Sequence, residues 1–372
     1  MRNLILISLC LVLFLLRASN ANEKLVVFGD SLSDNGNLYA LTGGTNPAEP
    51  YGDTFGSSGK EGYNFPGRFT DGQNWVDYFP SIANHFLSVT AYWKDGGTNF
   101  AVGGSTSKDL LQSDPAGFQP QIPTYLIAAG GQASADDLYV IWIGANDFKA
   151  GIDPAQTVTN IKDGIAMLSG KGARNFAVIT VPDLSLAPQI KAFGGATTLA
   201  AKRFVYTTNV LLVVELLRFA FLHRISIDLV DINAIVIPLV YNPGRFGFTN
   251  SMDAAFNLIT GAIVPDPNDY VFWDGFHPTT NAHRFAAKFI FNAIFSRRHF
   301  HEFLSVRVGA NPENGSLIGS VSSHSRCPQN RRLPMNCCSS RSNTGFCRLP
   351  PSSTHKAIDR NQATTCRSQG RL

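Results

Sequence analysis

The feature that most constrains this chain is a series of short, mostly apolar segments, most of which end at a glycine or a proline. Segments of this length and composition are typical of strands buried on both faces of a sheet. Helical patterns of apolar residues separate them, so the sequence predicts an α/β domain whose helices cover a parallel sheet. The expected strands are residues 24–28, 98–102, 138–143, 176–181 and 225–230. The main expected helices are residues 75–86, 121–129, 153–169, 197–222 and 279–295.

The N-terminus has the pattern of an export signal. Arg2 precedes a nearly unbroken apolar run over residues 4–16, and residues 19–21 supply the small side chains of a cleavage site. Such a run extends only ~20 Å as a helix, which is short of the ~30 Å hydrocarbon core of a bilayer. We therefore expect residues 1–21 to be a cleaved signal peptide rather than an uncleaved anchor. The mature protein would be secreted, or periplasmic in a bacterium.

A second apolar stretch lies inside the helix expected over residues 197–222. Residues 211–221 are mainly apolar, but Glu215 and Arg218 interrupt them. The two charges make this stretch a poor membrane span. We therefore expect a buried helix there and no integral membrane segment.

The composition changes near residue 297. Residues 297–372 carry 12 Lys/Arg against 3 Asp/Glu, whereas residues 1–296 carry 19 against 24. All five cysteines beyond the leader lie after residue 320, so the preceding domain must fold without disulfides. The basic pI thus describes the tail and gives no reason to expect nucleic-acid binding. We expect residues 22–296 to form one domain and 297–372 to be a disordered tail, with a surface-binding extension as the alternative.

Four polar segments lie where a parallel sheet would place a ligand. Three of them follow expected strands, and the fourth precedes the last expected helix. In open α/β sheets, ligands bind at the carboxyl ends of the strands. The segments are FGDSLSDNGN at 28–37, NFAVGGSTS at 99–107, GANDF at 144–148 and DGFHPT at 274–279.

The first and last of these segments contain the residue types of serine catalysis. On a turn, Asp274 can hold one imidazole nitrogen of His277, which leaves the other nitrogen free to take a proton from a hydroxyl such as that of Ser31. Each residue also has a structural alternative, since serines often fill turns and histidines often serve structurally in loops. The spacing of His223, His277 and His283 matches no recognised metal site.

The two middle segments contain candidate donors for a negatively charged oxygen. Ester hydrolysis needs hydrogen-bond donors aimed at the oxyanion that develops in the transition state. The backbone N–H of Gly103 or Gly104 can approach closely because a glycine has no side chain. The Asn146 amide is a neutral donor. Tight turns are the structural alternative for all three residues.

Together, the four segments in this order resemble the sequence blocks of the GDSL/SGNH hydrolase family over about residues 24–296. The resemblance implies a three-layer α/β/α sandwich with a five-stranded parallel sheet in flavodoxin-like order. The sequence lacks G-x-S-x-G at Ser31, which argues against the nucleophile elbow of the α/β-hydrolases.

The resemblance also implies a role for each candidate residue. Ser31 would be the nucleophile and contribute one oxyanion N–H. His277 would be the general base and then the general acid, and Asp274 would orient it. Gly104, which the family spacing favours over its neighbour, and Asn146 would be the other two oxyanion donors.

The implied activity is hydrolysis of carboxylic esters by a secreted monomeric enzyme that needs no cofactor and no metal. The substrate would be a small-molecule or lipid ester, and the motifs do not choose among acetyl, acyl and phospholipid esters. Two alternatives use the same domain: an acyltransferase, in which an alcohol resolves the acyl-enzyme, and a catalytically silent binding domain. Aromatic residues in the early loops could line an acyl or sugar pocket or simply pack together. These are Tyr51, Tyr63, Phe65, Phe69 and Trp75.

Overall fold

The computed structural model describes most of the expected domain. The described residues are 24–52, 65–82, 89–113 except 93 and 95, and 119–305, without the side chains of 80, 81 and 296–305. The expected signal peptide, most of the tail and Tyr63 lie outside these residues.

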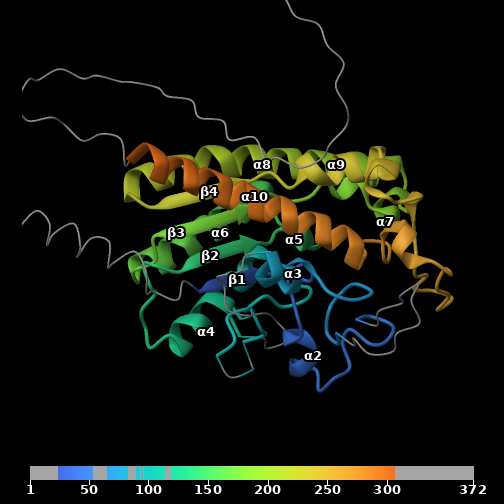
Figure 1. Cartoon of the computed structure of the whole chain (residues 1–372), viewed down its shortest axis with the longest axis horizontal. Coiled ribbons are helices and arrows are strands. Elements are labelled where there is room, and N and C mark those ends of the chain that lie inside the picture. The colour runs from blue at the N-terminus through green and yellow to red at the C-terminus, as the bar shows by residue number, and fades with distance from the viewer. Residues whose placement is uncertain are drawn as a thin grey trace, which may run out of the picture. The chain divides into compact units, whose positions relative to one another are not determined.

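Four parallel strands form the central sheet in the order β1-β2-β3-β4 (Figure 1). The strands are β1 Leu25–Gly29, β2 Leu138–Trp142, β3 Asn175–Ile179 and β4 Ser226–Val230. Val27 is opposite Val140, and Val140 is opposite Ala177, so corresponding positions line up across the first three strands. The register puts the carboxyl ends of all four strands at one edge of the sheet.

The expected fifth strand, residues 98–102, is only partly formed. It runs parallel to β1 and makes an isolated bridge between Asn99 and Val27, with a 2.7 Å bond from the Phe100 N–H to the Val27 carbonyl. The Gly29 N–H, which would continue this ladder, donates instead to the Gln121 side chain at 2.9 Å, so the pairing is interrupted there. Counting this segment, the order is 98–102, β1, β2, β3, β4, which is the flavodoxin-like order. The expected fold class is confirmed, with four regular strands rather than five.

Helices cover both faces of the sheet. One face packs against α3 Trp75–Ile82 and α10 Thr280–Ser305, and the other against α4 Gln121–Ala128, α6 Pro154–Gly170 and α8 Gly195–His223. Along β2, Val140 belongs to the first apolar cluster and Tyr139 and Ile141 to the second. This alternation explains why the strands are apolar throughout.

Local sequence signals set several helix boundaries. Asp153 accepts the Ala155 N–H at 2.8 Å and Pro154 follows it, so α6 begins with a side-chain cap and a proline in its first turn. The helix α10 runs past the expected boundary at residue 296, because no glycine or proline occurs before Gly309 to stop it.

Shorter elements stand mainly in the connections that follow the strands. They are α2 Asn37–Leu41, α5 Ala145–Ala150, α7 Pro188–Ala192, α9 Asn233–Tyr241, and a small parallel sheet of β5 Asn250–Ala254 and β6 Tyr270–Phe272. Single 3₁₀ turns are η1 Ser107–Leu110, η2 Leu184–Leu186, η3 Pro243–Phe246 and η4 Pro267–Asp269.

The helix α8 corrects one expectation. Among the described residues it is the one helix long and apolar enough to cross a membrane by length and composition. Residues 211–221 were expected to be buried, yet Val214, Leu217 and Phe221 are exposed. The apolar pattern has two sides, because Leu212 and Leu216 pack into the core on the opposite face.

Candidate active site

The turn that follows β1 presents Ser31. The Asp30 carbonyl accepts the N–H groups of Ser33 and Asp34 at 3.0 and 2.9 Å, so the chain bends sharply just after the strand. A Cβ at Gly29 would lie 2.5 Å from the Trp142 carbonyl oxygen, which makes glycine necessary at the end of β1. Ser31 itself is 9% exposed.

The DGFHPT turn folds around the carboxylate of Asp274. One oxygen of this carboxylate accepts the N–H groups of Phe276 and His277 at 2.7 and 2.6 Å. The other oxygen lies 2.7 Å from His277 Nδ1. A Cβ at Gly275 would lie 2.7 Å from the Gln189 side chain, so close packing on α7 requires glycine there.

The structure brings the three predicted triad residues together. His277 Nε2 lies 2.9 Å from Ser31 Oγ, across 246 residues of sequence. With Nδ1 protonated and donating to Asp274, Nε2 is the nitrogen that can accept the hydroxyl proton. The chain of contacts from carboxylate to imidazole to hydroxyl is the arrangement that activates a serine.

The electrostatics of the pair favour an ionised carboxylate beside the imidazole. Burial alone would raise the pKa of Asp274, but the charge of His277 and the hydrogen bonds from His277 and Tyr51 hold it below its ordinary value. Burial alone would lower the pKa of His277, but the charge and hydrogen bond of Asp274, with the charge of Asp30, raise it above its ordinary value. The imidazolium is thus stabilised where a proton would arrive.

Tyr51, expected only as one of the aromatic residues of the early loops, completes this network. The Tyr51 hydroxyl donates to Asp274 Oδ2 at 2.6 Å, the same oxygen that holds His277. Its ring packs at 5.7–6.3 Å between centroids against Phe69, Phe256 and Trp273. A separation of 223 residues from Asp274 left no local signal for the contact.

The two glycines of the second segment differ in their surroundings. The Gly103 N–H donates to Asp34 Oδ2 at 2.8 Å, and a Cβ there would lie 2.3 Å from the Phe69 ring. Gly104 has φ +83°, a conformation that favours glycine, and it lines the cavity beside Ser31. Gly103 is therefore engaged elsewhere, which leaves Gly104 as the glycine that faces the site.

Asn146 stands in the first turn of α5. Its amide nitrogen donates one hydrogen to the Ser105 carbonyl at 2.9 Å, which leaves the second hydrogen of the amide for a ligand. The neighbouring Asp147 is buried and accepts the Ser107 N–H and the Thr157 hydroxyl, each at 2.7 Å. These bonds tie α5 to the segment that carries Gly104.

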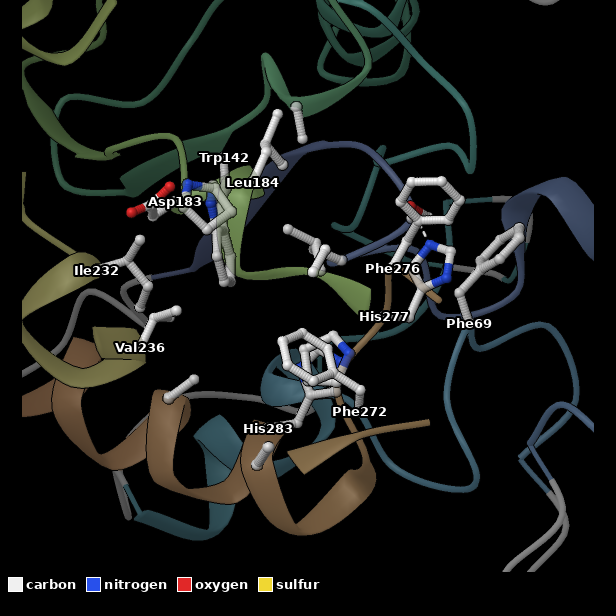
Figure 2. Close-up of a pocket in the computed structure, with 18 of the residues that line it drawn as sticks. Phe69, Trp142, Asp183, Leu184, Ile232, Val236, Phe272, Phe276, His277 and His283 are labelled. Atoms are coloured by element: carbon white, nitrogen blue, oxygen red, sulfur yellow. Dashed lines mark hydrogen bonds between the residues drawn. The ribbon is translucent and has the colours of Figure 1, made fainter. Parts of the chain in front are cut away.

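A cavity of about 310 Å³ adjoins these residues (Figure 2). Ser31, Gly104, Asn146 and His277 line it together. In Figure 2, Ile232 and Val236 lie across the cavity from His277. Most of the remaining wall is apolar and comes from the strand ends and from α7, α9, β6 and α10. It includes Trp142, Pro182, Leu184, Ala187, Ile190, Leu239, Val271, Phe272, Ala282 and Ala286.

One titratable side chain in this wall plays no part in the triad contacts. His283 is fully buried in the first turns of α10 and lines the cavity. Burial and the nearby His277 lower its pKa to about 3, so it stays neutral in ordinary buffers. Among the described residues, no group of three or more His, Cys, Asp or Glu side chains could hold a metal ion.

A parallel sheet with a hydrogen-bonded Ser–His–Asp set at its carboxyl edge defines the serine-hydrolase class of site. Comparison with known families agrees: residues 25–290 match the model described as GDSL-like lipase/acylhydrolase. The chain belongs to this family, and related proteins support a hydrolase of ester substrates.

Relatives share about a quarter of their residues with this chain. A GDSL esterase/lipase of Arabidopsis thaliana is 27% identical, over 74% of this chain and 86% of the plant protein. The thermolabile hemolysin of Vibrio parahaemolyticus is 25% identical, over 72% of this chain and 62% of the hemolysin, less than two thirds of its length. A phosphatidylcholine-sterol acyltransferase of Aeromonas hydrophila is 27% identical, over 46% of this chain and 48% of that enzyme.

Proposed function

We propose that this protein hydrolyses carboxylic esters through an acyl-enzyme on Ser31. The observation that carries the proposal is the continuous contact from Asp274 to His277 to Ser31, at 2.7 and 2.9 Å, at the wall of an apolar cavity. A silent binding domain would have no need to keep this alignment.

In the first half-reaction, Ser31 Oγ attacks the ester carbonyl carbon while His277 Nε2 takes the hydroxyl proton. The imidazolium formed lies against the Asp274 carboxylate, which stabilises it. When the C–O bond to the alcohol breaks, His277 returns the proton to the leaving oxygen. The alcohol departs, and the acyl group remains as an ester on Ser31.

Three donors would stabilise the tetrahedral oxyanion. They are the backbone N–H groups of Ser31 and Gly104 and the free hydrogen of the Asn146 amide. All three residues line the cavity. Such donors are effective because they are already oriented when the charge develops.

In the second half-reaction, water gives a proton to His277 and attacks the acyl carbon. The acid is released and the Ser31 hydroxyl is restored. An alcohol in place of water would give acyl transfer by the same steps, and the Aeromonas relative is named for such a reaction. Product analysis with and without an added alcohol separates the two outcomes.

The cavity wall favours an acyl group longer than acetyl. Beyond the catalytic residues, the wall is made mainly of aliphatic and aromatic side chains. Each methylene buried there contributes about 0.8 kcal/mol. We therefore assign the acyl chain of the substrate to this cavity and its alcohol to the open side. Residues 1–21 would direct export of the enzyme.

The test combines covalent labelling with an ester series. A fluorophosphonate should label the wild-type protein on Ser31, and peptide mass spectrometry locates the label. Nitrophenyl esters of increasing chain length should show rising kcat/KM before a plateau. Ser31→Ala should lose both signals, whereas Ser226→Ala, on the exposed end of β4, should keep both. Labelling at another residue, or hydrolysis that survives Ser31→Ala, would disprove the assignment.

A further inference from the structure

The outward face of α8 is apolar along its length although nothing in the described structure covers it. Tyr206 is 72% exposed and Phe221 is 84% exposed. The exposed apolar residues recur at helical spacing on one side, over about 33 Å of helix at 1.5 Å per residue. This α8 stripe consists of Leu199, Tyr206, Val210, Val213, Val214, Leu217 and Phe221.

The core does not account for the stripe, because a different side of the helix packs inward. Leu212 and Leu216 are fully buried against the sheet, and Phe204 is nearly so. In Figure 1, α8 lies at the β4 end of the sheet. A contiguous exposed apolar surface of this kind usually marks a binding site for a protein or a membrane.

The charges that flank the stripe identify the partner. Lys202, Arg203 and Arg218 are exposed on α8, and Arg224 is exposed at its C-cap. Glu215 is the single acidic residue of the helix, is only partly exposed, and pairs with Lys162 at 3.5 Å. The outward face is therefore apolar and cationic, although residues 1–296 as a whole carry a net negative charge.

These charges argue against a second copy of the chain as the partner. Pairing two α8 stripes would bring cations against cations with no exposed acid on the helix to neutralise them. Insertion across a bilayer is also disfavoured, because the opposite side of the helix is fixed in the core. An anionic lipid surface satisfies both the apolar side chains and the cations.

We infer that α8 docks the enzyme on the surface of an anionic lipid membrane. The helix α8 contacts α7 and η2, both of which contribute residues to the cavity wall. Phe193, in the turn before α8, is 60% exposed, and Ile190 of the preceding α7 lines the cavity. The docking itself is independent of the proposed function. Only its purpose, which is to bring lipid esters next to Ser31, rests on that function.

Vesicle co-sedimentation of the full chain tests the docking. Phosphatidylcholine vesicles containing phosphatidylglycerol should bind the wild-type protein much more tightly than pure phosphatidylcholine. Replacing Lys202, Arg203 and Arg218 together with Ser should weaken binding on the order of 10²-fold, at about fivefold per charge. The double variant Tyr206→Ser/Phe221→Ser should weaken it at least about tenfold.

A matched control separates α8 from other exposed apolar groups and from the tail. Ile127→Ser removes a side chain that is 82% exposed on α4, and it should bind vesicles like the wild type. The basic tail is identical in every variant, so a difference between variants reports α8. Circular dichroism and hydrolysis of a soluble short-chain ester should be unchanged in the α8 variants.

Several results would overturn the inference. Vesicle binding that is equal in the α8 variants and the wild type, or indifferent to phosphatidylglycerol, would do so. A wild-type dimer in sedimentation velocity that Tyr206→Ser/Phe221→Ser converts to monomer would show that the stripe binds a second copy. Failure of the proposed function would instead appear as absent hydrolysis of the soluble ester in every variant, with vesicle binding intact.

Discussion

The two ends of the cavity differ in the kind of interaction that forms them: directed hydrogen bonds at one end and mainly apolar contacts at the other. At the Ser31 end, Asp274 accepts four hydrogen bonds from Tyr51, Phe276 and His277, and His277 in turn contacts Ser31. The inner end is the end away from His277, where Ile232, Val236 and Trp142 line the cavity and Asp183 is the polar exception (Figure 2). Apolar side chains such as these make contact without direction. Directed bonds fix atoms to fractions of an ångström, whereas apolar walls fix only a volume.

The difference separates chemistry from selectivity. A directed network acts as a unit, so loss of one member removes the function of the others. An apolar wall acts by sums of small contributions, so one substitution changes the preferred chain length by degrees. Changes at the two ends should therefore differ in size and in the kinetic constant that they affect.

The largest expected effect comes from removing triad members. Ser31→Ala and His277→Ala should each lower kcat by several orders of magnitude, and about 10⁶-fold is usual when such a network is broken. The double variant should lose no more than either single one, because the groups act together. Ester hydrolysis by the three variants measures this, and additive losses would show that the two residues act separately.

The oxyanion donor should give the next largest effect. Asn146→Ala should lower kcat by ~10²–10³ with little change in KM, because the donor acts on charge that exists only in the transition state. Asn209→Ala is the matched control. The Asn209 amide accepts the Val181 N–H at 2.9 Å and donates to the Val181 carbonyl at 2.8 Å, and Asn209 does not line the cavity. A change confined to KM in Asn146→Ala would make that residue a ground-state contact instead.

The meeting of Asp274, His277 and Ser31 was predictable from the sequence, because these residues lie within short local patterns. Each candidate follows a strand or stands in one turn, and parallel strands bring such positions to one edge. Gly104 could be separated from its neighbour only by family spacing. The structure adds a physical reason, which is the bond from the Gly103 N–H to Asp34.

The inner end and the tyrosine were not predictable from local patterns. In the sequence, nothing distinguishes Ile232, Val236 and Ala286 from ordinary core residues. Only the packing of α9 and α10 shows that they border a cavity. Tyr51 lies in a loop without periodicity, far along the chain from its partner Asp274. The exposure of α8 was also hidden, because apolar residues on two sides of a helix resemble those of a fully buried one.

A substitution in the inner wall should change chain-length preference. Val236→Phe fills part of the cavity from α9, and Ala286→Leu fills it from α10. At about 0.8 kcal/mol per methylene, exclusion of two methylenes should lower kcat/KM for long acyl esters roughly tenfold to twentyfold. Hydrolysis of the shortest esters should be unchanged.

The matched control for this change lies on the same helix. Ile237→Phe adds a ring at a neighbouring position of α9 that is exposed and does not line the cavity, so its chain-length profile should equal that of the wild type. Equal profiles for all three variants would place the acyl chain outside this cavity.

The smallest expected effect concerns the pH profile. His277 must be neutral to accept the Ser31 proton, and its pKa is raised above the ordinary value. Wild-type kcat/KM should therefore fall as the pH decreases through a value above about 6.5. Tyr51 neutralises part of the Asp274 charge by donating to the oxygen that holds His277.

Removing that donor leaves more of the carboxylate charge to act on the imidazolium. Tyr51→Phe should therefore move the acid limb to higher pH, with kcat at alkaline pH lowered only a few-fold. Tyr78→Phe is the control, because its hydroxyl pairs with Thr280 rather than with the triad, and its pH profile should match the wild type. A limb that stays in place in Tyr51→Phe would mean that the tyrosine serves only packing. A downward shift would mean that Tyr51 supports the imidazolium by keeping the Asp274 carboxylate ionised and in place.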